Sequence, residues 1–377
     1  MPKSAFIYSE VLAGFDYGDD HPFKPMRARN TMELCGRYGL LDQPDLLMVS
    51  PEPAADEKAL VFHDPKYIEI LKRASRGEYD LEMLECGIGT SDCPALSGIF
   101  EMAMLALGAT LTGVDLLVNG SADRAFNLVG GFHHAQRDHA EGFCYVSDVG
   151  SAIAHLIAIG KRIAFVDIDA HHCNGIQKAF YDDDRVLKIS LHESGKTLYP
   201  WGGDETEIGD GPGRGFNVNL PLLEKSDDSV YVDAFERVVP PLLQAYKPEI
   251  VIAEIGADTL VSDPLTHLRL TSGGYRDVVK CLCGLSPKLL CLGGGGYDVF
   301  RTSKAWTLAW AEMRELEPVD QFAGLVGGMM YGADMDSLHD RPVYTTGPAK
   351  EAAMAEADRV VNYIHQNVFP ILGACKP

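Results

Sequence analysis

The sequence predicts an α/β fold in which a mostly parallel, doubly wound sheet is flanked by helices on both faces. Several apolar runs are continuous rather than alternating, as expected for strands that are buried on both faces. Helical patterns separate these runs, so strand and helix alternate along the chain. No repeat, low-complexity tract or Gly/Ser linker divides the 377 residues, so we expect a single domain over residues 1–377.

The strands and helices are expected in a regular order. Each expected strand is nearly continuous in apolar residues, and the five runs are 124–129, 161–169, 185–192, 249–258 and 288–297. Helical patterns occupy 147–159, 228–246 and 272–285, and an amphipathic stretch at 352–368 should close the fold. Another helix should follow Asp92-Cys93-Pro94 and run to Val114, with the proline in its first turn, where proline is tolerated.

The charge balance and the cysteines limit the function classes. A formal charge of −21 disfavours nucleic-acid phosphates and anionic membranes and attracts cationic ligands, although solubility alone also explains it. The longest apolar stretch identified from the sequence, 149–160, is too short to span a bilayer, and the N-terminus has no signal-peptide pattern. The nine cysteines include no Cys-x-x-Cys pair, which indicates reduced thiols. Cys281 and Cys283, which are separated by one residue, are expected to contribute to packing and not to bind a metal. We therefore expect a cytoplasmic protein without direct nucleic-acid or membrane binding.

Polar and glycine-rich motifs lie at the ends of all five predicted strands. In an open parallel sheet, ligands bind beyond the carboxyl ends of the strands. The motifs at these ends are GGFHH at 130–134, DIDAHH at 167–172, SLH at 190–192, GAD at 256–258 and GGGGY at 293–297. One such motif could be incidental, but five at matching strand ends are not explained by core packing.

Asp169, His171 and Asp258 are the candidate metal ligands. With the two-residue period of a strand, Asp169 and His171 face the same side, together with Asp167. One imidazole and two carboxylates with an open position are typical of a catalytic zinc site. An ion-pair or N-cap cluster is the alternative, and it would be favoured for an isolated Asp-x-His.

His133, His134 and Tyr297 are the candidate catalytic residues. Adjacent histidines beside a metal suit general acid–base catalysis, and Asp167 and Asn174 are candidates to orient their rings. A phenol at the end of a glycine run, on a flexible hinge, can stabilise a developing oxyanion. By itself the glycine run would indicate a turn or a weak phosphate loop, but it has neither the Lys-Ser/Thr of a P-loop nor dinucleotide spacing.

In this order, the motifs resemble those of the histone deacetylase superfamily. They are GGFHHA at 130–135, EGFCYVSD at 141–148, VDIDAHHCNG at 166–175, SLH at 190–192, GAD at 256–258 and LGGGGY at 292–297. More precisely, the chain resembles bacterial class I-like deacetylases and acetoin-utilisation-type proteins, from His21 to Trp306. The resemblance implies an arginase-like fold with an eight-stranded parallel sheet, and zinc-dependent hydrolysis of acetyl-lysine amides in proteins or peptides.

The resemblance also implies roles for individual residues. Zinc, with Fe²⁺ as the alternative in the cell, would be bound by Asp169, His171 and Asp258. The substrate would be contacted by the tunnel residues Gly142, Phe143 and Tyr199, by Leu265 at the mouth, by Asp92 at the rim and by Arg27 near the acetate-release pocket. A structural potassium ion would be held by Asp167, Asp169, His171, Ser190 and Leu191, in part through backbone carbonyls.

The chain departs from the class I pattern at several positions. Asn174 replaces an aspartate behind the second histidine, and Tyr199 replaces a tunnel phenylalanine. Pro264 and Phe300 stand where inositol-phosphate-dependent nuclear members carry arginines, so we do not expect corepressor-type partners.

Other functions remain open from the sequence. The nearest alternative is an amidohydrolase of acetylpolyamines or other small cationic acetyl-amides, although no tunnel-narrowing insertion is evident. A two-manganese ureohydrolase is disfavoured because Cys173 occupies an expected ligand position. An inactive acetyl-lysine binding module is disfavoured by the complete set of metal, histidine and tyrosine positions.

Overall fold

The computed structural model of the chain describes residues 2–318 and 337–376, and its centre is one parallel sheet. Its strands have the order β2-β1-β3-β8-β7-β4-β5-β6, and every neighbouring pair is parallel. They are β1 (Ser4–Ile7), β2 (Leu46–Val49), β3 (Arg124–Asn127), β4 (Ile163–Asp167), β5 (Val186–Glu193), β6 (Asn217–Leu222), β7 (Ile250–Glu254) and β8 (Leu289–Leu292). The expected eight-stranded parallel sheet is therefore confirmed.

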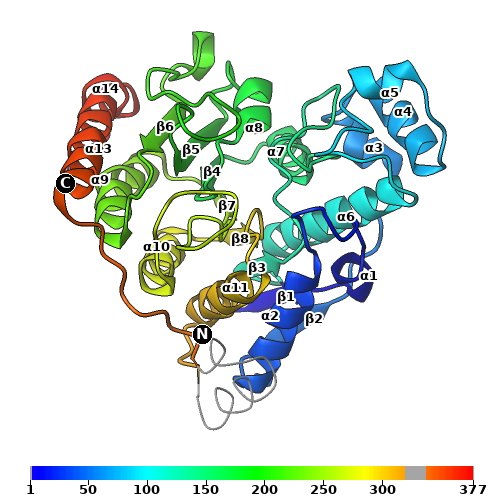
Figure 1. Cartoon of the computed structure of the whole chain (residues 1–377), viewed down its shortest axis with the longest axis horizontal. Helices are drawn as coiled ribbons and strands as arrows, with labels where there is room; N and C mark the ends of the chain where they lie inside the picture. The colour runs from blue at the N-terminus through cyan, green and yellow to red at the C-terminus, as the bar shows by residue number, and fades with distance from the viewer. Residues whose placement is uncertain (1, 319–336, 377) are drawn as a thin grey trace.

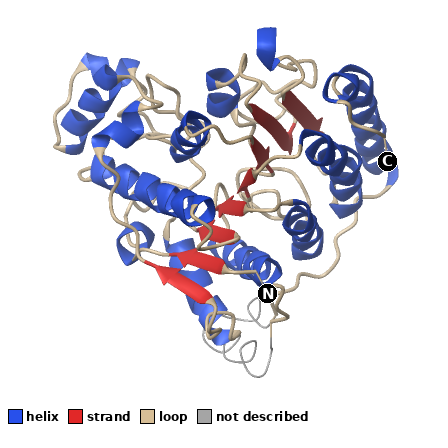
Figure 2. Cartoon of the chain, turned by 180° about the vertical axis from the view of Figure 1, so that it is seen from behind, coloured by secondary structure: helices blue, strands red, loops and turns tan. Residues whose placement is uncertain are grey.

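Helices cover both faces of the sheet (Figures 1 and 2). One layer consists of neighbouring helices α2 (Met26–Arg37), α11 (Val299–Arg314), α10 (Ser272–Leu285), α9 (Asp228–Tyr246) and α13 (Gly347–Asn367). The opposite layer contains α6 (Ile99–Val118) and α7 (Asp148–Ala158). The short helices are α1 (Glu10–Ala13), α3 (Asp56–Leu60), α4 (Pro65–Ser75), α5 (Leu81–Glu85), α8 (Asn174–Ala179), α14 (Phe369–Leu372) and the 3₁₀ turn Gly211–Gly213.

The five strands predicted from apolar runs are present, but several end earlier than expected. β4 ends at Asp167, so Asp169 and His171 lie on the loop beyond it. Their common direction therefore does not come from the two-residue period of a strand, so the prediction from strand periodicity is wrong for these two residues. The loop instead turns locally, because the backbone N–H groups of Asp169 and His171 donate to the carboxylates two residues earlier.

The buried helix α6 corrects two expectations. It begins at Ile99, because Gly98 has a left-handed backbone with φ 78° that cannot continue a helix, so Pro94 lies outside the first turn. Stretch 149–160 is also not the longest apolar one, since α6 is long and apolar enough to cross a membrane by length and composition. However, 72% of its most apolar window is buried inside the fold, and it packs on β3 and α7. Its apolar character is therefore that of a core helix.

Candidate active site

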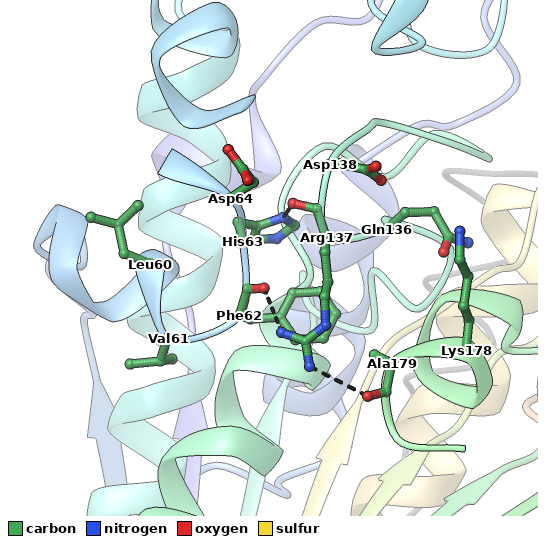
Figure 3. A pocket seen from close by; sticks show the side chains of 10 residues that line it. All are labelled: Leu60, Val61, Phe62, His63, Asp64, Gln136, Arg137, Asp138, Lys178 and Ala179. Atoms are coloured by element: carbon green, nitrogen blue, oxygen red, sulfur yellow. Dashed lines mark hydrogen bonds between the residues drawn. The ribbon is translucent and has the colours of Figure 1, made fainter. Parts of the chain in front are cut away.

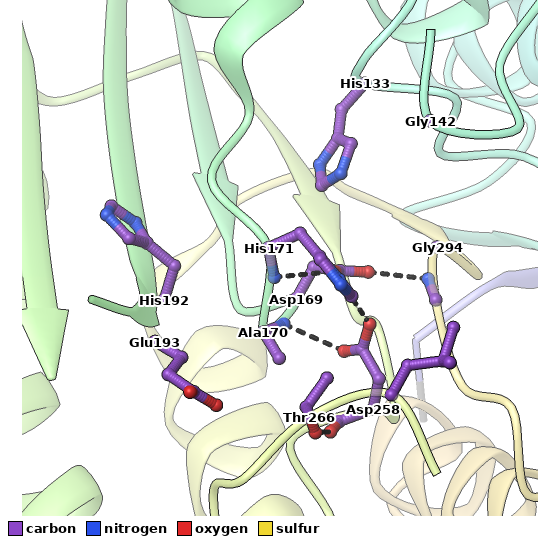
Figure 4. Close-up of polar contacts among 12 residues, drawn as sticks. His133, Gly142, Asp169, Ala170, His171, His192, Glu193, Asp258, Thr266 and Gly294 are labelled. Atoms are coloured by element: carbon purple, nitrogen blue, oxygen red, sulfur yellow. Dashed lines mark hydrogen bonds and ion pairs between the residues drawn. The ribbon is translucent and has the colours of Figure 1, made fainter. Parts of the chain in front are cut away.

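Buried polar side chains meet at the carboxyl ends of the neighbouring central strands β3, β8, β7 and β4 (Figure 4). The sheet order places these strands side by side, although they are far apart in sequence. The residues that follow each strand therefore face one another, and they include His133 and His134 after β3, Tyr297 after β8, Asp258 after β7, and Asp169 and His171 after β4.

The three predicted metal ligands form one buried cluster. The Nδ1 atom of His171 lies 3.1 Å from Asp169 Oδ1 and 2.9 Å from Asp258 Oδ2, and the ligand atoms all lie within 4.8 Å of one another. The backbone N–H of Ala170 donates to Asp258 Oδ1 over 2.8 Å, and that of Gly295 to Asp169 Oδ2 over 2.6 Å. Ligands about 2.0–2.1 Å from a tetrahedral zinc would be roughly 3.4 Å apart, so this donor set fits a small divalent cation after slight spreading.

The glycine run before Tyr297 is explained by close packing. A Cβ atom on Gly295 would lie 2.1 Å from Asp258 Oδ2 and 2.7 Å from Asp169 Oδ2. The buried Arg27 guanidinium donates to the carbonyls of Gly296, over 2.6 Å, and of Gly294. The run is thus held against the carboxylate cluster, and the sequence interpretation of a flexible hinge does not describe it.

His133 lies between two buried carboxylates. Its Nδ1–H donates to Asp167 Oδ2 over 2.8 Å, and Glu254 Oε1 is 3.0 Å from the same nitrogen. Burial has the largest single effect and would lower the pKa of His133, but the charge and hydrogen bond of Asp167 and the charge of Asp169 together outweigh it and raise the pKa. Glu254, which the sequence analysis did not single out, is fully buried, and burial together with Asp167 and Asp169 raises its pKa well above the usual range.

His134 faces an amide instead. Its Nδ1 is 2.7 Å from Asn174 Oδ1, and its Nε2 is 3.1 Å from His133 Nε2. Burial, followed by the positive charges of His133 and His171, lowers the pKa of His134 well below its usual value. A neutral imidazole in this position can accept a proton.

The predicted tunnel residues surround this cluster. The Phe143 ring lies 5.8 Å from the Tyr297 ring, and the Tyr199 ring lies 5.2 Å from that of His134. Gly142 has φ +53°, and a Cβ there would lie 2.4 Å from the His134 ring, so glycine permits this approach. A narrow pocket of about 20 Å³ lined by Phe143, Tyr297 and both histidines has room for about one water molecule.

Two predicted substrate residues lie further out. Asp92 is exposed, as a rim residue requires, and its carbonyl lies 3.2 Å from Nε2 of His21, whose ring packs 4.8 Å from that of Phe143. Leu265 is half-buried on the loop after Asp258, and its N–H donates to Asp263 Oδ1 over 2.9 Å. Asp263 also accepts from the Tyr297 N–H over 2.8 Å and was not predicted. This carboxyl therefore links the mouth loop to the tyrosine.

The predicted potassium residues are buried and adjacent. Asp167 pairs in register with Ser190 on the neighbouring strand β5. The Ser190 hydroxyl lies 2.8 Å from His192 Nδ1, and the Leu191 carbonyl accepts from the Tyr231 hydroxyl over 3.4 Å. The structure brings these residues together but does not assign them an ion.

A larger pocket of about 470 Å³ lies beside the segment that follows His134 (Figure 3). Arg137 crosses it and donates to the carbonyls of Phe62, over 3.0 Å, and Ala179, over 3.3 Å. None of the predicted catalytic residues lines this pocket. The candidate site is therefore identified by its buried polar groups and not by cavity size.

Comparisons with known proteins agree on one family. The histone deacetylase domain family matches residues 21–313. Acetoin utilization protein AcuC of Bacillus subtilis (strain 168) is 35% identical over 326 residues, which cover 84% of each protein. Histone deacetylase 1 of Homo sapiens is 34% identical over 318 residues, which cover 84% of this chain but only 65% of the human protein, less than two thirds of its length.

Solved structures support the same relationship. An HDAC homologue from Aquifex aeolicus has a TM-score of 0.83 at 29% identity, with 94% of this chain and 99% of that chain covered. An HDAC homologue complexed with SAHA has a TM-score of 0.85 at 28% identity, with 97% of this chain and all of that chain (100%) covered.

Proposed function

Since the chain belongs to the histone deacetylase family, we propose that it hydrolyses the Nε-acetyl amide of lysine in proteins or peptides and releases acetate. The observation that carries the proposal is the buried cluster of Asp169, His171 and Asp258 beside the paired histidines. These three residues would hold one Zn²⁺, with Fe²⁺ as the alternative in the cell. When bound, such an ion polarises an acyl carbonyl and lowers the pKa of a water to roughly 7.

The chain's own residues then move the protons and stabilise charge. His134 Nε2 accepts the proton of the attacking water, because its Nδ1 is already engaged by Asn174 over 2.7 Å. The Tyr297 hydroxyl donates a hydrogen bond to the developing oxyanion. His133, held by Asp167 over 2.8 Å, acts mainly through its charge and orientation, and the leaving amine receives its proton from this pair of imidazoles.

The surrounding residues would select and position the substrate. Gly142, Phe143 and Tyr199 would line the path of the acyl-lysine stem, with Leu265 at its mouth and Asp92 at the exposed rim. Arg27 would border the acetate-release side, next to the glycine carbonyls that it binds. A potassium ion held near Asp167 and Ser190 would be structural. The cytoplasmic location and the absence of nucleic-acid partners stay predictions.

The test is turnover of a fluorogenic acetyl-lysine peptide together with metal analysis. The zinc-loaded protein should release acetate, and a chelator should stop the reaction. His171→Ala should lose both stoichiometric metal and turnover, whereas the matched change His339→Ala, at an exposed histidine, should keep both. Stoichiometric zinc in the His171→Ala protein would contradict the ligand assignment, and acetylpolyamines in the same assay test the small-molecule alternative.

A further inference from the structure

Two residues at which the chain departs from the class I pattern meet on one carboxylate, that of Glu141. The Asn174 side-chain Nδ2 donates to Glu141 Oε1 over 2.8 Å, and the Tyr199 hydroxyl donates to the same oxygen over 2.7 Å. Glu141 is half-buried in the segment between His134 and Phe143. The Tyr199 hydroxyl is therefore turned to this carboxylate while its ring packs against His134.

The second oxygen of Glu141 is also surrounded by donors. Gln136 Nε2 donates to Oε2 over 3.1 Å, and His139 Nε2 is 3.5 Å away. Burial would raise the pKa of Glu141, but the hydrogen bonds from His139, Tyr199 and Asn174 favour its ionised form, and its pKa is lowered to about 2. Glu141 is thus an ionised group that only accepts hydrogen bonds.

An acceptor-only partner fixes the direction of the Asn174 amide. The NH₂ end must face Glu141, so the carbonyl end, Oδ1, faces His134 Nδ1 over 2.7 Å. A flipped amide would bring its oxygen against the carboxylate. Because Oδ1 has no hydrogen, His134 must carry its proton on Nδ1, which leaves the lone pair on Nε2.

We infer that Glu141 is a positioning residue that selects the base-competent Nδ1–H tautomer of His134 by holding the Asn174 amide in one orientation. The inference rests on the proposed function, in which His134 is the general base. An asparagine alone does not impose this tautomer, because its amide can rotate and donate to Nδ1. The imidazole proton then moves to Nε2, where His133 Nε2, 3.1 Å away, accepts it. An aspartate in place of Asn174 would need no such help, since both of its oxygens accept.

Glu141 and the residue at position 174 therefore depend on each other. Asn174→Asp in the native background would place two carboxylates about 2.8 Å apart, where the bond from Asn174 now lies. Like charges at this distance repel and disturb the orientation of His134. Once Glu141 is truncated, the same aspartate can accept from His134 without that conflict.

The first experiment reads the tautomer directly. In the metal-loaded full chain with ¹⁵N-labelled histidine, NMR should show His134, assigned by its loss in His134→Ala, as the Nδ1–H form. Glu141→Ala should introduce the Nε2–H form, with Glu141→Ser as a second truncation if the alanine variant does not fold. Glu85→Ala removes an exposed carboxylate from neighbouring α5 and should leave the tautomer and turnover unchanged. An unaltered Nδ1–H signal in the folded Glu141 variant overturns the inference.

The second experiment reads the coupling through kcat on an acetyl-lysine peptide. Glu141→Ala and Asn174→Asp should each lower kcat by about three- to tenfold, as expected when only a fraction of the molecules is competent. The double variant should be faster than either single variant. A double variant whose loss is the product of the two single losses overturns the inference. If the native protein releases no acetate, the proposed function fails, and the NMR result alone decides the role of Glu141.

Discussion

His133 and His134 are neighbours at one strand end, yet their surroundings differ in charge. His133 faces the carboxylates of Asp167 and Glu254 at 2.8 and 3.0 Å, whereas His134 faces the neutral amide of Asn174 at 2.7 Å. The pKa of His133 is raised, because the charge and hydrogen bond of Asp167 and the charge of Asp169 together outweigh burial. The pKa of His134 is lowered by burial and by the charges of His133 and His171. Two identical side chains thus have their pKa values shifted in opposite directions by their surroundings.

This difference indicates how the pair divides its work. A charged imidazole can hold and orient, while a neutral one can accept a proton. On the side of His134 that faces Asn174, the negative charge belongs to Glu141, and the Asn174 amide lies between Glu141 and His134. The second histidine therefore gains orientation without a carboxylate in direct contact that would raise its pKa.

Replacing each histidine in turn should give the largest effect and can break the comparison. His134→Ala should lower kcat by roughly 10²–10⁴, the usual contribution of a general base. His133→Ala should cost clearly less, because a charge and a hydrogen bond are lost but the base remains. Steady-state kinetics with metal content checked in both variants is the measurement. Equal losses, or a larger loss for His133, would reverse the assignment of roles.

Tyr297→Phe tests the role assigned to the Tyr297 hydroxyl, which is to stabilise the oxyanion while the histidines transfer protons. Removing one oxyanion donor should lower kcat by roughly 10²–10³, while the fold and the bound metal are kept because only a hydroxyl is lost. The hydroxyl is not needed to position the backbone, since Tyr297 is tied to Asp263 through its N–H over 2.8 Å. Turnover close to that of the native protein would remove Tyr297 from the mechanism and leave more of the catalysis to the imidazoles.

The sequence predicted the central strands well because they are buried on both faces and read as continuous apolar runs. It did not mark β1, β2 or β6, and eight strands were expected only from the family resemblance. β2 lies at one edge of the sheet with Leu47 and Met48 exposed, and β6 lies at the other edge and contains Pro221. β2 is only four residues long, and β6, although buried along its whole length, has Asn217, Asn219 and Pro221 among its apolar residues, so neither reads as a continuous apolar run. At an edge, proline costs no ladder bond that a central strand would need.

The metal and catalytic candidates were recognisable because they form motifs at strand ends, whereas two of their supporting residues were not recognised. Asp167 and Asn174 lie beside the histidines as expected, but Glu254 and Glu141 were not identified. Glu254 had one available signal, since a carboxylate ends the otherwise apolar β7 and both faces of that strand are buried. Glu141 begins the motif EGFCYVSD, but the motif did not indicate its role, because its partners Asn174 and Tyr199 come from other segments and meet it only in the folded chain.

Glu254→Gln tests the surroundings of His133 through the thermal stability of the protein. Burial and the neighbouring Asp167 and Asp169 raise the folded-state pKa of Glu254 well above its unfolded value. A group with a raised folded pKa stabilises fully below the unfolded pKa and loses that contribution as pH rises toward the folded pKa. Glutamine has no proton to lose. The Tm of Glu254→Gln relative to that of the native protein should therefore increase from pH 6 to pH 9, by about 2 °C or more. Thermal melts of both metal-free proteins measure this, and a constant Tm difference would show that Glu254 is not held in its neutral form.

The smallest expected effect concerns exposed charges, which lie outside the buried pair His133 and His134. The chain carries a formal charge of −21, and Asp92 is exposed near the residues that pack on Phe143. Exposed charges are screened by salt within about 8–10 Å at physiological ionic strength, whereas the buried contacts of His133 are screened much less. Raising salt from about 0.05 to 0.5 M should therefore lower kcat/KM for cationic acetyl-lysine peptides by a few-fold, but hardly change it for neutral peptides.

Asp92→Asn should reduce this salt dependence. The matched control is Glu351→Gln, which removes an exposed carboxylate on α13. Equal salt responses of both peptide classes would make the acidic surface a matter of solubility, and would confine functional electrostatics to the carboxylates around the two histidines.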